Sequence, residues 1–223
     1  MAGVSAKELA SAYPEVFHMA EYDAWPSIQR NGLLSTTALL DLFGIIGEER
    51  HAIESCRRPQ KVSITSAVHG TAIIRDQKPM RPSALRRCLS DVSESQWYGL
   101  LNRRVFFWLQ EKRLHTLLSA RAYRSETHCV LTFATESLLS AYEDRITLSA
   151  LNTGSTLYNP PTRGSGTFCP LAVYPFVERR KKAGSRNAVV ELAVDYAVPN
   201  AAALCKRVAI MSGATVVKTL FER

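Results

Sequence analysis

The apolar pattern of this chain changes character after the first quarter, and that change limits the folds open to it. Up to residue 57 the spacing predicts helices, the first beginning with a capping box formed by Ser5 and Glu8. Beyond that point, short alternating or continuously apolar segments predict strands, with further helices between them. Helices first and several separated strands later favour an α+β fold over a doubly wound parallel sheet.

The expected elements form two sets. Helices are predicted over residues 5–12, 23–32, 35–43, 48–57, 83–89, 93–101, 111–122 and 135–142. Strands are predicted over residues 62–65, 70–75, 105–109, 128–133, 189–194, 207–211 and 215–220, with extended segments at 16–19 and 145–148. Residues 152–170, rich in Gly, Ser, Thr and Pro, are expected to form a long functional or mobile loop.

Length and composition narrow the class of protein. With 223 residues and 46% hydrophobic content, we expect one globular domain over residues 1–223. No apolar run approaches the roughly 18 residues that span a bilayer, and residues 1–8 lack the layout of a secretory signal. Five widely spaced cysteines indicate neither a disulfide framework nor a metal site. We therefore expect reduced thiols and a cytoplasmic location.

The charge is unevenly distributed along the chain. The 28 Lys and Arg residues exceed the 20 Asp and Glu residues, which gives a formal net charge of +8. Basic residues occur in clumps, the largest over residues 179–182, where flanking Gly and Ser predict a loop. A basic surface attracts polyanions such as nucleic acid or a dinucleotide, although general solubility is the alternative explanation.

Sequence motifs for phosphate-binding loops, dinucleotide folds and metalloproteases are absent. Three other features of the sequence could carry chemistry. His18 lies beside apolar residues, and its imidazole could either play a structural role or donate to a ribose hydroxyl. Arg57 and Arg58 either cap a helix C-terminus or grip a phosphate. Glu191 lies in an apolar strand, so its carboxylate should either line a cleft or pair with an arginine.

Several of these features resemble segments of the DarT-type ADP-ribosyltransferases. Residues 17–34, with an aromatic-His pair and an Ile-x-x-x-Gly-x-Leu pattern, are similar to the start of that family. Residues 191–199 resemble the later segment with the catalytic Glu, and residues 57–62 resemble the segment with the NAD-gripping Arg. Residues 105–108 resemble the aromatic central strand. Together these segments span most of the chain in the same order.

Two further patterns resemble a bacterial branch of the same superfamily. They are Arg-Asp-Gln-Lys-Pro-Met at residues 75–80 and Arg-Gly-x-x-Thr-Phe at residues 163–168. The resemblance implies an ADP-ribosyltransferase-like fold with a split, mixed or antiparallel β core of two small sheets and an N-terminal helical region. It also implies a cleft that binds NAD as a co-substrate, with no metal ion.

The resemblance assigns roles to particular residues. Glu191 would be the catalytic acid that steadies the positive charge on the nicotinamide ribose, and His18 would hold the adenosine ribose. Arg57 or Arg58 would hold the pyrophosphate, with Arg57 counted as catalytic. Further cofactor contacts are expected from Gly32, Leu33 and Phe107, with Tyr98, Phe106 and Trp108 supplying further aromatic area. In the long loop, acceptor contacts are expected from Tyr158, Arg163 and Thr167.

The implied function is mono-ADP-ribosyl transfer, with nucleic acid (DNA or RNA) as the expected acceptor. Such an enzyme would act as a toxin or phage-defence effector, and a neutralising partner protein would be consistent with that role. Two alternatives remain open from the sequence. One is a non-catalytic nucleic-acid-binding module on a transferase-like fold, bound through residues 179–182. The other is an enzyme similar to RNA 2′-phosphotransferases, which would release a cyclic phosphate of ADP-ribose.

Overall fold

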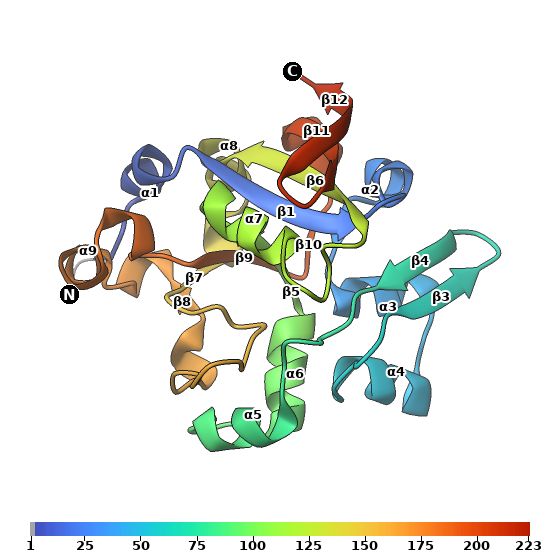
Figure 1. Ribbon diagram of the computed structural model, residues 1–223, viewed down its shortest axis with the longest axis horizontal. Helices are drawn as coiled ribbons and strands as arrows, with labels where there is room; N and C mark the ends of the chain where they lie inside the picture. Colours follow the sequence, from blue (N-terminus) through green and yellow to red (C-terminus); the bar gives the residue numbers. More distant parts are fainter. Residues whose placement is uncertain (1–2) are drawn as a thin grey trace.

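An antiparallel sheet of eight strands forms the centre of the computed structural model, which describes residues 3–223 (Figure 1). Its strand order is β12-β11-β6-β1-β5-β9-β7-β8. The strands are β1 (Glu15–Glu21), β5 (Arg104–Trp108), β6 (Thr127–Ala134), β7 (Ile146–Ser149), β8 (Cys169–Pro170), β9 (Glu191–Asp195), β11 (Cys205–Ser212) and β12 (Thr215–Glu222). Two small sheets pair β2 (Leu33–Leu34) with β10 (Ala197–Val198) and β3 (Val62–Ser66) with β4 (Gly70–Ile74).

The large sheet is nearly divided between β1 and β5. Only one residue pair, Phe17 with Trp108, is in register across these two strands. By contrast, β1 is paired with β6 along its whole length, and β5 is paired in the same way with β9. The resemblance implied two small sheets, whereas the structure has one sheet whose two four-stranded halves are joined at a single point, which we call the split.

Ten short α-helices surround the sheets within residues 3–223. They are α1 (Ala6–Ala12), α2 (Trp25–Asn31), α3 (Thr36–Phe43), α4 (Gly47–Glu54), α5 (Pro82–Cys88), α6 (Glu94–Asn102), α7 (Glu111–Leu118), α8 (Thr135–Tyr142), α9 (Phe176–Ala183) and α10 (Ala201–Leu204). Short 3₁₀ turns occur at η1 (Glu143–Arg145), η2 (Ser165–Thr167), η3 (Leu171–Val173) and η4 (Ser185–Asn187). The capping box of Ser5 and Glu8 is present at the start of α1, as predicted.

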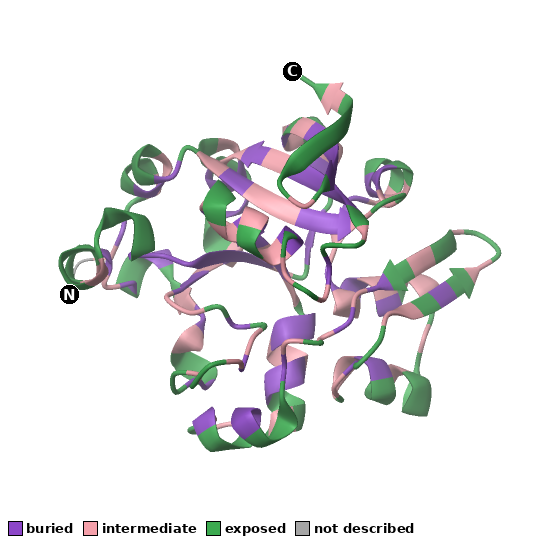
Figure 2. Cartoon of the chain, viewed as in Figure 1, coloured by how far each residue is buried: buried purple, intermediate pink, exposed green. Residues whose placement is uncertain are grey.

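The buried residues separate the two faces of the large sheet. On one face, Val16, Leu131 and Leu192 belong to the largest apolar cluster, which also includes residues of α1, α2 and α8. On the other face, α7 packs against β1, β6 and β11, while α5 and α6 form a separate cluster with Phe168 beside β5. Figure 2 shows the resulting contrast between buried central strands and the exposed β3–β4 hairpin. The split therefore lies where two groups of helices meet.

Most predicted elements are present, but several differ in extent. The basic run at residues 179–182 was expected in a loop, and this prediction is wrong because these residues lie within α9. Phe176, which is buried, anchors that helix, and Arg and Lys have favourable helix propensities. The predicted helices over 48–57 and 111–122 end earlier, at Glu54 and Leu118, whereas the extended segment at 16–19 is the longer strand β1.

Residues 1–2, which begin the segment analysed for a secretory signal, lie outside the described residues. None of the helices in residues 3–223 has both the length and the apolar composition that crossing a bilayer requires.

Candidate functional site

His18 lies at the split between the two halves of the sheet. Its Nδ1 donates to the backbone carbonyl of Phe106, 2.8 Å away, and its ring lies beside that of Phe107, with centroids 5.7 Å apart. Burial lowers the pKa of His18 to about 4; the bond to Phe106 opposes this shift, and the charge of Arg75 adds to it. The imidazole is therefore neutral at pH 7. Because Nδ1 donates to Phe106, Nε2 of the neutral ring can only accept a hydrogen bond from a hydroxyl. From the sequence, the imidazole was expected to donate to a ribose hydroxyl.

Glu191 is the first residue of β9 and is only 4% exposed. It pairs with Trp108 on one side and with Ser149 on the other. Both carboxylate oxygens accept from the backbone N–H of Thr153 at 3.2 Å, and Oε2 also accepts from the Thr153 hydroxyl at 2.6 Å. The ion pair with an arginine that the sequence left open is therefore replaced by hydrogen bonds to a loop.

The environment of Glu191 favours its protonated form. Burial raises the pKa of the carboxyl to about 7, while the hydrogen bonds from Thr153 and the charges of Arg163 and Arg113 act against that rise. Near pH 7 the carboxyl is consequently present in both protonation states. A group with such a pKa can accept or release a proton under physiological conditions, which is what general acid–base catalysis requires.

Arg163 organises the loop that covers Glu191. The residue is 2% exposed, and its Nη1 donates to the carbonyls of Thr153 at 3.1 Å and Ser155 at 3.0 Å. Its guanidinium also lies over the ring of Trp97, 5.7 Å from the centroid. The expected acceptor contact of Arg163 would need a side chain at the surface. The structure instead gives it the role of holding Thr153 against Glu191.

The other two predicted acceptor residues lie in the same loop and differ from each other. Tyr158 is 97% exposed, with a positive φ of 57°, and its ring is free to contact a large substrate. The Thr167 hydroxyl accepts from the backbone N–H of Gly164 at 2.9 Å, so it also has a role in the turn. Of the three residues, only Tyr158 is therefore exposed in the way that a residue in contact with an acceptor would be.

Arg57 and Arg58 have different environments. The Arg58 side chain is buried and donates to the carbonyls of Arg75 and Ile53 and to Asn102 Oδ1. Burial lowers the pKa of its guanidinium to about 10, and the charge of Asp76 opposes that shift. Arg57 is half-buried and donates through Nε to the carbonyl of Met80 at 2.6 Å. Because the donors of Arg58 already have protein partners, Arg57 is the better placed to hold a phosphate.

Three of the predicted cofactor contacts have structural roles. Phe107 is 1% exposed and packs edge-on against Phe133 in the main core, so it presents no surface to a ligand. Gly32 has φ +79°, and a Cβ there would lie 2.6 Å from the Cα of Pro199. Leu33 is buried and pairs with Val198. Gly32 and Leu33 therefore allow β2 and β10 to approach each other closely.

Residues 75–80, noted in the sequence only as a pattern, connect the split to the Glu191 loop. Arg75 donates through Nη1 to the carbonyl of Met19 at 3.5 Å, and its Nε lies 3.3 Å from a carboxylate oxygen of Glu21. At the other end of the segment, the carbonyl of Pro79 accepts from the N–H of Thr156 at 3.1 Å. Arg75 thus brings a charged guanidinium next to His18, a role that the sequence did not predict.

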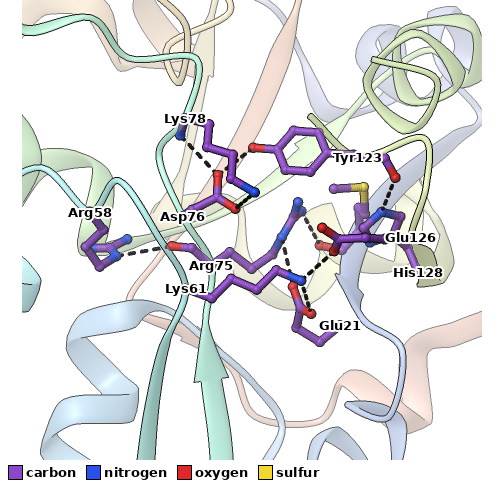
Figure 3. A network of polar contacts seen from close by, with 10 residues as sticks. Glu21, Arg58, Lys61, Arg75, Asp76, Lys78, Tyr123, Glu126 and His128 are labelled. Atoms are coloured by element: carbon purple, nitrogen blue, oxygen red, sulfur yellow. Dashed lines mark hydrogen bonds and ion pairs between the residues drawn. The ribbon is translucent and has the colours of Figure 1, made fainter. Parts of the chain in front are cut away.

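Asp76 fixes this segment in place. Its side chain is buried and accepts from the Tyr123 hydroxyl at 2.9 Å and from the backbone N–H of Lys78 at 3.0 Å. Lys78 Nζ lies 3.3 Å from the second carboxylate oxygen. Lys61 adds ion pairs with Glu21 and Glu126 on the same side (Figure 3). These contacts hold the 75–80 segment across the ends of β1 and β6.

Arg113 is a second residue that the sequence reasoning missed. Its charge lowers the pKa of Glu191, and its Nη2 donates to Asn187 Oδ1 at 2.9 Å. Because Asn187 follows α9, this contact joins α7 to the segment after the basic helix. Arg113 follows Lys112 in the sequence, and no pattern there connected it to Glu191.

Two surface grooves lie away from these residues. One, of about 710 Å³, is lined by the ends of β5, β7, β8 and β9, and the other, of about 360 Å³, runs along α6. Neither is lined by His18, Arg57 or Glu191. The Thr153 loop covers the Glu191 carboxylate, which has no open access to either groove.

The raised pKa of Glu191 predicts a pH-dependent stability. Its pKa is about 7 in the folded protein, against a reference value of 4.5, so folding favours the protonated carboxyl. The native state should therefore lose about 3 kcal/mol of stability from this group as pH rises from about 4.5 to about 7. His18 gives the opposite slope, because its pKa is about 4 when folded and 6.5 as reference, so stability from His18 rises with pH across that window.

A Gln variant separates the two slopes. The free energy of unfolding of Glu191→Gln and of the unmodified protein can be measured in urea at each pH. We expect the value for Glu191→Gln to rise relative to that of the unmodified protein as pH rises from about 4.5 to about 7. The exposed Glu222→Gln variant serves as the control and should show no such gain. If the difference in free energy of unfolding between Glu191→Gln and the unmodified protein did not change with pH, the raised pKa of Glu191 would be contradicted.

Comparison with known proteins places the chain in a family. Searches of curated proteins and of solved structures found no match. Residues 14–205, which include His18, Arg57 and Glu191, match the family of unknown function DUF7002. Because this match covers most of the chain, the protein belongs to the DUF7002 family.

Proposed function

We propose that this protein is an NAD-dependent mono-ADP-ribosyltransferase with nucleic acid as its acceptor. The observation that carries the proposal is the row Phe17–Trp108–Glu191 across three neighbouring strands at the split. Two strand spacings separate the ends of this row by about 10 Å, a distance that the ribose–pyrophosphate–ribose part of NAD can bridge. A neutral imidazole adjoins one end of the row, and a carboxylate of raised pKa forms the other.

Each group has a chemical role in this proposal. Cleavage of the bond between nicotinamide and ribose develops positive charge on the sugar, and the Glu191 carboxylate stabilises that charge most in the transition state. The same carboxylate can accept the proton of the incoming nucleophile. His18 Nε2 would accept a hydrogen bond from a ribose hydroxyl, and the guanidinium groups of Arg57 and Arg75 would bind the pyrophosphate. His18 lies next to Phe17 in β1 and donates to Phe106 of β5 across the split, so NAD held by both His18 and Glu191 would have to pass through the split.

The position of α9 supports a nucleic-acid acceptor. This helix carries Arg179, Arg180, Lys181 and Lys182, and all but the half-buried Arg179 are exposed. The contact between Arg113 and Asn187 joins the following segment to α7, whose Arg113 charge acts on Glu191. A polyanionic backbone on these residues would therefore lie close to the proposed catalytic acid. The same helix also supports the second candidate, a binding module without catalysis.

NAD should stabilise the protein against heat. At a concentration 100 times its dissociation constant, a ligand that binds only the folded state adds about 2.7 kcal/mol, which raises Tm by about 5 to 10 °C for a chain of this size. Differential scanning fluorimetry with NAD measures this shift, and ATP serves as the control nucleotide. An unchanged Tm with NAD, together with salt-dependent binding of DNA or RNA, would favour the binding module instead.

A further inference from the structure

The Glu191 carboxylate depends on one residue of the covering loop for its hydrogen bonds. Within residues 3–223, every donor to its two oxygens belongs to Thr153: the backbone N–H, which both oxygens share, and the hydroxyl. Both residues are buried, with 1% of Thr153 and 4% of Glu191 exposed. Oε2 accepts from both donors, whereas Oε1 accepts only from the shared N–H, at 3.2 Å, and keeps acceptor capacity for another group. The two oxygens are therefore distinct.

Thr153 is held in place from the α5 side of the loop. Arg163 Nη1 donates to the carbonyl of Thr153 at 3.1 Å. The backbone of Arg163 is bonded to the end of α5, since its N–H donates to the carbonyl of Cys88 at 2.8 Å and its own carbonyl accepts from the N–H of Ser90 at 3.1 Å. Through these contacts, α5 supports the residue that contacts the Glu191 carboxylate.

Thr156 forms another attachment of the loop and offers a comparison with Thr153. Its Oγ1 accepts from the backbone N–H of Arg81 at 2.6 Å, and its own N–H donates to the carbonyl of Pro79 at 3.1 Å. It is as buried as Thr153, with 1% exposed. Two threonines three residues apart in one loop thus have buried hydroxyls, one bonded to the carboxylate and the other to the backbone before α5.

The contact with Thr153 acts on the protonation of Glu191. Burial favours the neutral carboxyl, whereas hydrogen-bond donors favour the ionised form. The charges of Arg163 in the loop and Arg113 on α7 also favour the ionised form. The strand neighbours Trp108 and Ser149 carry no charge. Thr153 is consequently the directly bonded residue that offsets the effect of burial.

We propose that Thr153 is a positioning residue that fixes the Glu191 carboxylate and favours its ionised form, with Arg163 holding Thr153 in place. The role deepens the proposed function and rests on it for any effect on transfer, because the ionised carboxylate is the form that stabilises a ribose cation. The effect of Thr153 on the proton affinity of Glu191 does not require catalytic activity, so the two can be measured separately.

Nuclear magnetic resonance titration of the Glu191 carboxyl, assigned by comparison with Glu191→Gln, tests the role directly. Thr153→Val removes the hydroxyl at nearly constant shape, and we expect Glu191 to titrate about one pH unit higher than in the unmodified protein. The ionised fraction at pH 7 then falls about fivefold, so label transfer from NAD should fall by about the same factor and recover at pH 9. Thr153→Ser keeps a hydroxyl and should restore both the titration and the transfer.

The matched control is Thr156→Val. It removes an equally buried hydroxyl from the same loop, so it should lower Tm but leave the titration of Glu191 unchanged. The proposal would be overturned by an unchanged titration in Thr153→Val, by an equal change in Thr156→Val, or by a loss of transfer that is the same at pH 7 and pH 9. A higher titration in Thr153→Val, in a protein that transfers no label from NAD, would support the role of Thr153 and count against the proposed function.

Discussion

Replacing Glu191 by Gln is expected to lower ADP-ribosyl transfer by about 10² to 10³-fold. The substitution keeps the size of the side chain and removes the charge that would stabilise the ribose cation in the transition state. Gln can still accept from Thr153 N–H through its amide oxygen, so the covering loop should stay in place. Transfer of label from NAD to separate pools of DNA, RNA and protein measures the effect and identifies the acceptor.

Two controls make this result specific. Glu222→Gln removes a carboxylate from the exposed end of β12 and should leave transfer unchanged. In Glu191→Gln itself the rise in Tm caused by NAD should persist, because the carboxylate acts more on the transition state than on bound NAD. Equal transfer by both variants would remove Glu191 from the mechanism. Loss of the NAD-induced Tm rise only in Glu191→Gln would instead make Glu191 a binding residue.

Local sequence signals predicted most of the elements, since they act within a few residues. The capping box at Ser5 and Glu8 begins α1 as predicted, and the helix predicted from Ser93 begins with a capping box of Ser93 and Gln96 in the structure. The strands around Val105 and Val130 were recognisable from their bulky apolar residues. The basic helix α9 was missed because it buries few residues and its flanking Gly and Ser are typical of loops.

The order of strands could not be predicted in the same way. The split between β1 and β5 depends on pairing between segments far apart in the chain, and a strand's sequence does not specify its neighbours. Within the candidate site, Glu191 was recognisable as a carboxylate in an apolar strand. Its actual partner, Thr153, lies in a loop whose course is fixed by hydrogen bonds from Arg163 to backbone carbonyls. Every residue has such a carbonyl, so this contact leaves no mark in the sequence.

The same limit explains why the sequence could not choose between Arg57 and Arg58. Adjacent residues of the same type have the same chemistry, and only the surrounding backbone distinguishes them. The carbonyls of Ile53 and Arg75 and the side chain of Asn102 converge on Arg58, which therefore joins α4, the 75–80 segment and α6. Arg57, by contrast, donates to one backbone carbonyl, that of Met80.

Arg58→Leu is expected to destabilise the fold by about 3 to 5 kcal/mol. The substitution removes the guanidinium and leaves two buried carbonyls and the side-chain oxygen of Asn102 without their donor, and each unpaired group carries its own desolvation cost. Arg57→Gln should cost only about 1 kcal/mol, the contribution of a single hydrogen bond, yet should abolish the NAD-induced rise in Tm. Urea unfolding of both variants, with thermal scans in NAD for Arg57→Gln, measures both effects. Similar destabilisation by the two substitutions would contradict the division of roles, and a full NAD response in Arg57→Gln would exclude Arg57 from the proposed site.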